Sequence, residues 1–139
     1  MNIADVMTRN VTMVSPDASL VVAAEAMAER DAGALPVGEG DQLVGMITDR
    51  DIAIRGVASG KPVERMLVRE VMTPQVLYCF EDQACDEVAG NMAEVQTRRL
   101  PVVNREKRLV GIVSLGDFAR NEPEAAKTAE TGVAATAPA

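Results

Sequence analysis

The chain has 139 residues and a formal net charge of −7, with apolar residues at 47% of positions but aromatic residues at only 2%. This length fits one ordinary domain or a pair of small repeats, with a core of aliphatic and methionine side chains. The acidic balance disfavours a nucleic-acid partner, which would require a basic face. No apolar run approaches the roughly 18 residues that cross a bilayer, and the start, MNIADVMTRN, lacks a signal-peptide pattern. We therefore expect a cytoplasmic protein with no membrane partner.

Side chains suited to metal binding or catalysis are scarce. The sequence contains no histidine, and Cys79 and Cys85 do not form a CxxC pair, so we expect no metal site. Without histidine the usual hydrolytic triad is unavailable, and we expect no catalytic residues and no enzyme activity. Cys85 falls on an apolar helical stripe, and Cys79 alternates with Tyr78 and Phe80 on an expected strand. Both positions favour packing over redox chemistry.

The sequence contains two copies of one pattern. A shift of 65 residues aligns Val6-Met7-Thr8 with Val71-Met72-Thr73, and Leu35-Pro36-Val37 with Leu100-Pro101-Val102. One extra residue then makes the offset 66, so that Asp51 aligns with Asp117. Repetition of this kind indicates two stacked supersecondary units. We divide the chain into repeat 1 (1–60), a linker (61–67), repeat 2 (68–120) and a tail (121–139). The tail has almost no large apolar residues, so we expect it to be mobile.

Each repeat reads as strand, helix, strand, strand and helix. Val11–Ser15 and Val76–Phe80 are rich in strand-forming residues and are predicted to be strands. Ser19 is predicted to cap a helix that ends near Gly33. The helices of both repeats carry apolar residues at a spacing of three and four; these stripes are Leu20, Ala23, Ala24, Met27 and Ala28, and Cys85, Val88, Ala89, Met92 and Ala93.

The second half of each repeat is predicted to be a hairpin followed by a helix. Leu35–Val37 and Gln42–Ile47 read as its two strands in the first copy, and a helix follows from Asp49 toward Gly60. The glycines at 38 and 40 could suggest a phosphate-binding loop. However, the matching turn in the second copy, Asn-Arg-Glu-Lys, has no glycine, which favours a plain hairpin turn.

The strand–helix junctions LVGMITDRD and LVGIVSLGD are the most informative segments. In each, a hydroxyl residue precedes an acid by three positions: Thr48 and Asp51, then Ser114 and Asp117. One interpretation is a capping box, in which both side chains bond to the first turn of the helix. The other is a ribose-binding site, because a carboxylate can accept hydrogen bonds from both ribose hydroxyls. Both roles can coexist.

Two arginines distinguish the copies. Arg98 and Arg99 precede the Leu-Pro-Val segment of the second copy, where the first copy has Gly33 and Ala34. A guanidinium matches the oxygens of a phosphate, so a phosphate-binding role is one interpretation. The alternative is a pair of solvated cations at a helix end.

Taken together, the V-M-T starts, the A-L-P-V and R-L-P-V segments and the G-x-x-[TS]-x-x-D junctions resemble tandem cystathionine-β-synthase-type (CBS) domains, also called a Bateman module. The second copy is also similar to repeats in the γ subunit of AMP-activated protein kinase. The resemblance implies an α+β fold of two β-α-β-β-α repeats related by a pseudo-two-fold axis, with packed sheets and flanking helices.

The resemblance also implies a function. It implies clefts that bind adenosine-containing ligands, namely AMP, ADP, ATP, NADH or S-adenosylmethionine, with AMP and ATP as first candidates and no required cofactor. Asp51 and Asp117 would then accept the ribose, Thr48 and Ser114 would lie near ribose or phosphate, and the base would contact Ile47, Val113, Pro36 and Pro101. We expect a homodimeric, non-catalytic sensor that signals to an unidentified protein in trans. The alternative is a constitutive dimerisation or scaffold protein with no nucleotide ligand.

Overall fold

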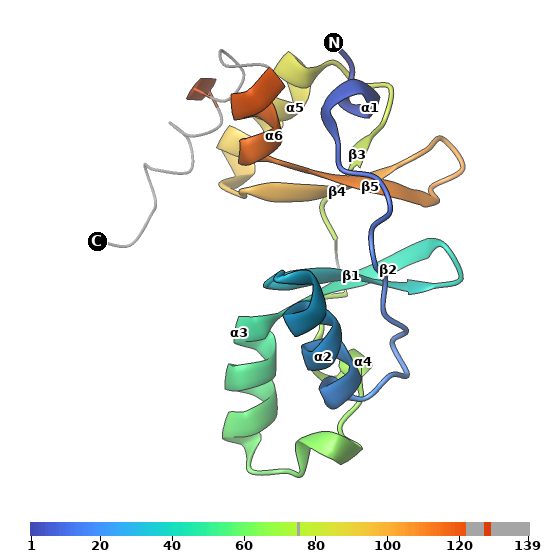
Figure 1. Ribbon diagram of the computed structural model, residues 1–139, viewed down its shortest axis with the longest axis vertical. Helices are drawn as coiled ribbons and strands as arrows, with labels where there is room; N and C mark the ends of the chain where they lie inside the picture. The colour runs from blue at the N-terminus through green and yellow to red at the C-terminus, as the bar shows by residue number, and fades with distance from the viewer. Residues whose placement is uncertain (75, 122–126, 129–139) are drawn as a thin grey trace. The chain divides into compact units, whose positions relative to one another are not determined.

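The computed structural model describes residues 1–74, 76–121 and 127–128. The chain divides into two compact units, which we name by the repeat that dominates each. The first-repeat unit is Thr12–Val76, and the second-repeat unit is Met1–Val11 with the described residues from Leu77 onward. In each unit the helices lie on one face of a small sheet (Figure 1), which confirms the predicted α+β class. The expected tail lies outside the described residues, apart from Asn121, Lys127 and Thr128.

The first-repeat unit is a hairpin with helices. Strands β1 (Ala34–Glu39) and β2 (Gln42–Thr48) pair antiparallel. The helix α2 (Leu20–Arg30) precedes them. The helical segment after β2 changes form along its length and ends at Gly60, where φ is +80°. Its successive parts, and the short helices that complete the unit, are α3 (Asp49–Asp51), the π-helix η1 (Ile52–Gly56), the 3-10 helices η2 (Val57–Ser59) and η3 (Val63–Arg65), and α4 (Val68–Val71).

The second-repeat unit has a three-stranded sheet in the order β3-β4-β5. Strand β3 (Cys79–Phe80) runs parallel to β4 (Arg99–Val103), and β4 pairs antiparallel with β5 (Leu109–Ser114). The helices of this unit are α1 (Ile3–Val6), α5 (Cys85–Val95) and α6 (Leu115–Asn121).

The two long helices follow the predicted stripes only in part. The Ser19 side chain caps α2 by accepting from the amide of Val22, as predicted. Leu20, Ala23 and Met27 are buried, whereas Ala24 and Ala28 are exposed. In α5 the stripe is buried from Cys85 to Met92 and Ala93 is half-buried. The core of the first-repeat unit therefore covers only part of the apolar stripe of α2 and leaves Ala24 and Ala28 exposed.

Two predicted features are wrong in detail. The helix end assigned to Gly33 lies earlier, because Asp31 takes the left-handed conformation with φ of 51° and its amide bonds back to the last turn. The strands expected at Val11–Ser15 and Val76–Phe80 shrink to a single bridge between Val14 and Val37 and to the two residues of β3. After Val14 the chain turns at once, since the Asp17 amide bonds to the Ser15 hydroxyl, so no longer ladder forms.

The V-M-T segments exchange places between the repeats. Helix α1 bonds to the second repeat, where the amide of Ile3 donates to the carbonyl of Gln83 and Thr8 pairs with Ile112. Helix α4 bonds to the first repeat, where Thr73 pairs with Met46. The compact units therefore do not coincide with the repeats along the sequence.

The repeated glycine of the L-V-G motif makes this exchange possible. A Cβ on Gly45 would come within 2.8 Å of the Thr73 carbonyl oxygen, and one on Gly111 within 2.7 Å of the Thr8 carbonyl oxygen. Any larger residue would push the V-M-T backbone off the strand edge, so both glycines are explained by close backbone approach.

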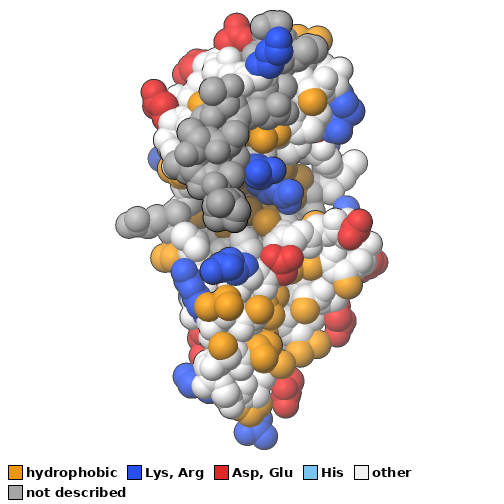
Figure 2. All heavy atoms as spheres, turned by 90° about the vertical axis from the view of Figure 1, so that its left-hand side faces the viewer, with side chains coloured by type: hydrophobic (Ala, Val, Ile, Leu, Met, Phe, Trp, Pro, Cys, Tyr) orange, Lys and Arg blue, Asp and Glu red, His pale blue; other side chains and the backbone are white. Residues whose placement is uncertain are grey.

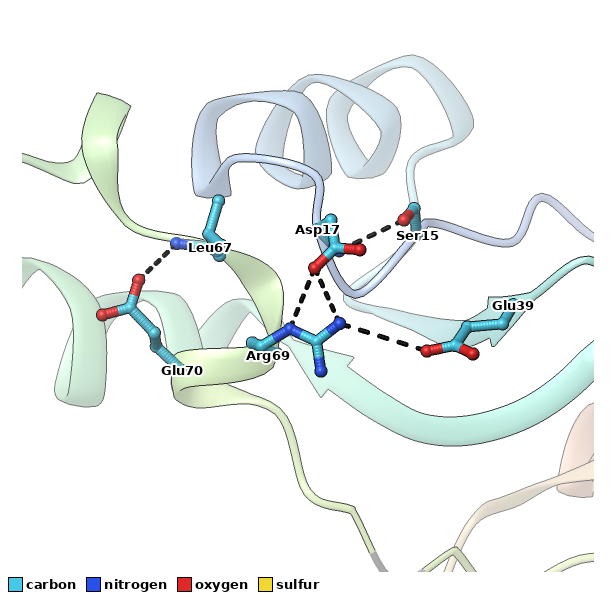
Figure 3. A network of polar contacts seen from close by, with 6 residues as sticks. All are labelled: Ser15, Asp17, Glu39, Leu67, Arg69 and Glu70. Carbon is cyan, nitrogen blue, oxygen red and sulfur yellow. Dashed lines mark hydrogen bonds and ion pairs between the residues drawn. The ribbon is translucent and has the colours of Figure 1, made fainter.

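Ion pairs reinforce the exchanged segments unequally. In the first-repeat unit, Arg69 of α4 donates to Asp17 Oδ1 from Nε and Nη2, at 2.9 and 2.6 Å, and its Nη2 lies 4.0 Å from Glu39 Oε1 (Figure 3). The aligned acid in the other repeat, Asp82, instead pairs with Arg105 of the β4–β5 turn, with an Nη2–Oδ1 distance of 2.7 Å. Each unit thus has an arginine paired with the acid at the aligned position, Asp17 or Asp82. The two arginines come from different elements.

Each unit has its own hydrophobic core, with few aromatic side chains. The first core gathers around α2 and the hairpin, and the second around α5, α6 and β4. The buried members are Val14, Leu20, Ala23, Met27, Leu35, Val37, Ile47, Met66, Val68 and Val71 in the first, and Ile3, Val6, Met7, Cys79, Cys85, Val88, Ala89, Met92, Leu100, Val102, Val113 and Phe118 in the second. Over the described residues, no helix combines the length and apolar character needed to span a bilayer.

Candidate functional site

The first junction is a complete capping box at the end of β2. The Thr48 amide donates to Asp51 Oδ2 at 3.0 Å, and the Asp51 amide donates to Thr48 Oγ1 at 3.0 Å. The other carboxylate oxygen, Oδ1, lies 3.9 Å from Nε of Arg55, which is beyond hydrogen-bond distance. Oδ2 of Asp51 therefore takes part in the cap, whereas Oδ1 has no hydrogen bond from Arg55.

The second junction repeats this arrangement in a more enclosed setting. The Ser114 amide donates to Asp117 Oδ2 at 2.8 Å, and the Ser114 hydroxyl lies 3.1 Å from the same oxygen. Arg120 Nη2 donates to the other oxygen, Oδ1, at 2.5 Å. Within the described part of the chain, Asp117 is the one buried charged side chain, with 3% of its surface exposed. Its burial is tolerated because both oxygens are hydrogen-bonded.

The strand partner brings Arg98 and Arg99 to the second junction. The Leu115 amide donates to the Arg98 carbonyl oxygen at 3.0 Å, and Arg99 pairs with Ser114 across the sheet. Both arginine side chains are exposed. The structure therefore brings these two predicted residues beside Ser114, as antiparallel pairing of β4 with β5 requires.

At the first junction, the position equivalent to these arginines has an acidic neighbour instead of basic side chains. There the Asp49 amide donates to the Gly33 carbonyl oxygen at 2.9 Å, in the same arrangement. The Asp49 carboxylate packs over this glycine, so that a Cβ on Gly33 would lie 3.0 Å from Oδ2. Asp49 thus lies beside the strand start that carries two arginines in the second copy. Sequence reasoning found the arginines but missed the contribution of Asp49, which follows directly from the alignment of Asp49 with Leu115.

The four apolar residues expected around a base are all buried. Ile47 and Val113 have 0% of their surface exposed and belong to the first and second cores. Pro36 and Pro101 are also buried, and each lies in the first strand of its hairpin.

In the part of the chain that the structure describes, the cysteines and acidic groups do not form a metal centre. Cys79 and Cys85 are both buried, and no disulfide joins them. Burial, with a smaller effect from the neighbouring Cys85, raises the pKa of the Cys79 thiol to about 12, so it stays a protonated, poorly nucleophilic thiol at neutral pH. The described residues contain no group of three or more cysteine and acidic side chains arranged to hold a metal ion.

The structure thus defines a class of protein: paired α+β repeats, each with a capped hydroxyl–acid junction at the end of a hairpin. The family model of the CBS domain matches residues 3–56 and 68–124. The chain belongs to the CBS domain family, as the sequence motifs predicted.

Relatives of known structure share most of the chain. Hypoxic response protein 1 of Mycobacterium tuberculosis is 42% identical over 121 residues, covering 86% of this chain and 84% of that protein. Its crystal structure, described as having two coordinated zinc ions, superposes with a TM-score of 0.79 at 40% identity, covering 88% of this chain and 100% of that one. This chain has no histidine, and its described residues contain no cluster of cysteine and acidic side chains that could hold zinc.

Two similar structures contain adenosine ligands. CBSX2 of Arabidopsis thaliana in complex with AMP superposes with a TM-score of 0.75 at 28% identity, covering 88% of this chain and 96% of that one. The CBS domain pair of protein MJ0100, in complex with 5-methylthioadenosine and S-adenosyl-L-methionine, has a TM-score of 0.75 at 30% identity, covering 86% of this chain and 98% of that one.

Proposed function

We propose that this chain is a non-catalytic regulatory module that binds adenosine-containing ligands through its two hydroxyl–acid junctions. The observation that carries the proposal is the geometry of Thr48 and Asp51, repeated at Ser114 and Asp117. The adenosine ligands in the AMP complex and in the MJ0100 complex support the ligand class. AMP and ATP are the first candidates, followed by ADP, NADH and S-adenosylmethionine.

The chemistry of the first junction suits a ribose diol. Asp51 Oδ2 accepts from the backbone, and Oδ1 can accept from ribose hydroxyls, since the nearest guanidinium nitrogen, Arg55 Nε, is 3.9 Å away. The Thr48 hydroxyl accepts from the Asp51 amide and retains its proton for donation to the ligand. Hydrogen bonds to a charged group contribute roughly 1.5–3 kcal/mol each, which is enough to orient the nucleoside.

At the second junction, Arg98 and Arg99 would bind the phosphates of the ligand. They lie beside Ser114 and are exposed, and a guanidinium fork matches phosphate oxygens. Because Asp49 adds negative charge at the first junction, we expect the second junction to prefer ligands with more phosphate.

Arg98→Ala and Arg99→Ala should weaken ATP and AMP binding more than adenosine binding. Equal loss for all three ligands, measured by calorimetry, would contradict the phosphate role.

Signalling requires a partner, and we propose that the first is a second copy of the chain. Hydrophobic side chains gather on the face of the first-repeat unit that includes α2 and η1 (Figure 2), with Val22 49%, Ile54 58% and Val57 61% exposed. A cavity of about 410 Å³ lies between α2 and the segment after β2, with an almost entirely apolar lining that includes Ala24 and Ala28. Apolar surface of this kind marks an interaction site.

Val57→Glu should shift the protein from dimer to monomer in analytical ultracentrifugation, whereas a sedimentation coefficient equal to that of wild type would contradict this interface.

The regulated protein would be contacted in trans, in the cytoplasm. A ligand shifts the module between two conformations only by the difference in its affinity for them. The alternative function, a constitutive dimeric scaffold, is favoured by one observation: the backbone and side chains of the chain itself make all the bonds of both capping boxes. A capping box stabilises a helix by itself, so its presence alone does not require a nucleotide.

Thermal unfolding of ligand-free protein against AMP, ADP, ATP, NADH and S-adenosylmethionine separates these functions. A ligand at about 100 times its dissociation constant should stabilise the fold by about 2.7 kcal/mol. Asp51→Ala and Asp117→Ala should each reduce that shift. If no ligand raises the melting temperature, the scaffold function stands. If the variants melt lower but keep the whole ligand shift, the acids are only caps.

A further inference from the structure

The second junction contains an internal competitor for its own acid. Arg120 follows Asp117 by one helical turn in α6, and its Nη2 lies 2.5 Å from Asp117 Oδ1. The arginine side chain is 67% exposed, while the carboxylate is 4% exposed. The pair therefore lies at the edge of a buried group, with the cation on the solvent side.

Both carboxylate oxygens of Asp117 already accept hydrogen bonds from the protein. Oδ2 accepts from the Ser114 amide and lies within hydrogen-bond distance of the Ser114 hydroxyl. Oδ1 accepts from Arg120. A ribose diol that approached Asp117 from solvent would meet the guanidinium before it met the carboxylate.

The first junction has no equivalent contact. With the offset of 66, Arg120 aligns with Ile54, an apolar side chain. The nearest cation, Arg55, is one residue further along, and its Nη1 donates instead to the carbonyl oxygen of Val71 at 3.1 Å. Its Nε stays 3.9 Å from Asp51 Oδ1. The same capping box therefore presents a hindered acid in one repeat and an accessible acid in the other.

We propose that Arg120 is a specificity-determining latch on Asp117, which must leave Oδ1 before a ribose can bind there. This inference rests on the proposed function of the junctions. A ligand with a phosphate offers the displaced guanidinium an anionic partner in place of the carboxylate, and a nucleoside without phosphate does not. The latch thus makes the second junction select phosphorylated adenosine ligands over adenosine, in the same direction as Arg98 and Arg99.

The test measures adenosine and AMP binding by calorimetry in an Asp51→Asn background, which leaves the second junction as the adenosine site. Arg120→Gln removes the charge and leaves a shorter, neutral polar side chain. We expect Arg120→Gln to strengthen adenosine binding about fivefold, the scale of a partly exposed ion pair, and to strengthen AMP binding less. The ratio of AMP affinity to adenosine affinity should therefore fall.

The matched control is Arg55→Gln, made in an Asp117→Asn background so that only the first junction binds. It should change adenosine affinity less than twofold, because Arg55 makes no hydrogen bond to Asp51 Oδ1. Circular dichroism checks that each variant is folded at the temperature of the titration.

The outcomes are distinct. Weaker or unchanged adenosine binding in Arg120→Gln, with binding intact in its parent, overturns the latch and leaves the proposed function standing. An unchanged affinity ratio overturns its role in specificity. If wild type and every variant fail to bind both probes, the proposed function fails and the latch fails with it.

Discussion

The two junctions have the same capping box, but they hold the outer oxygen of the acid differently. Asp51 Oδ1 has Arg55 Nε at 3.9 Å, whereas Asp117 Oδ1 accepts from Arg120 at 2.5 Å. The surrounding corner differs too, with Asp49 over Gly33 in one copy and two exposed arginines in the other. The features that both copies share serve folding in each unit and, in our proposal, ribose binding as well, so they do not distinguish the two sites. The features that differ are therefore the better guide to what each site selects.

The largest expected difference between the repeats concerns the helix after each junction. Phe118 is completely buried in the second core, while the aligned Ile52 is only half-buried. Phe118→Ala should lower the free energy of unfolding by about 3–5 kcal/mol, because it leaves a large cavity. Ile52→Ala should cost only about 1–2 kcal/mol, since less surface is removed from the core. Urea unfolding followed by circular dichroism measures both, and equal losses would show that the two helices are packed alike.

The next difference concerns the acids themselves. Asp117→Ala removes a cap and the partner of Arg120 from a buried position, and we expect a loss of about 2–3 kcal/mol. Asp51→Ala removes only a cap, at a cost of about 1 kcal/mol. Thr48→Ala and Ser114→Ala are the matched controls, and they should cost similar amounts in the two repeats. A larger loss for Asp51→Ala than for Asp117→Ala would reverse the comparison.

A smaller effect is expected where the exchanged segments are tied down. Arg69→Ala removes the ion pair that joins α4 to Asp17 and should destabilise the protein by up to about 1 kcal/mol, and less at high salt. Its control is Arg65→Ala, an exposed arginine on η3. If Arg65→Ala costs as much as Arg69→Ala at low salt, the effect comes from net charge and not from the pair.

The smallest predicted effect is a pH dependence confined to the second-repeat unit. The hydrogen bond from Arg105 holds the pKa of Asp82 below its usual value of 3.8. Because the folded pKa is the lower one, the pair stabilises the fold above the unfolded pKa, and this contribution is lost as the pH falls through the folded pKa. NMR titration should find Asp82 below 3.8, and Arg105→Gln should return it toward that value. An unchanged titration in the variant would contradict this cause.

Local patterns were sufficient to predict the hairpins, the Ser19 cap and the capping boxes at Thr48 and Ser114. These features depend on residues within a few positions of one another, where spacing determines contact. The exchange of α1 and α4 between repeats depends on contacts between distant parts of the chain, and four-residue helices leave little periodicity to detect. Its one sequence signal was the glycine shared by both L-V-G motifs, which the backbone contacts of Thr8 and Thr73 explain.

The candidate site was predicted in the same uneven way. Both acids and both hydroxyls were found from their repetition, and the pairing of β4 with β5 brings Arg98 and Arg99 beside them. Arg120 lies three residues beyond the acid that ends the repeated motif, so the motif did not predict it. The spacing of three residues on a helix would have placed it next to Asp117. The burial of Ile47 and Val113 was not foreseen, since an apolar strand end can face either a cleft or a core.

The central claim is that the two junctions bind adenosine ligands, and calorimetric titration with AMP tests it most directly. The experiment compares wild type with the Asp51→Asn, Asp117→Asn double variant, in which the carboxamides keep the shape of the acids but lose their charge. Wild type should bind AMP, and the folded double variant should show at least a tenfold loss, as expected for about 1.4 kcal/mol or more from charged hydrogen bonds. Equal binding by both proteins, or no binding by wild type, would contradict the account.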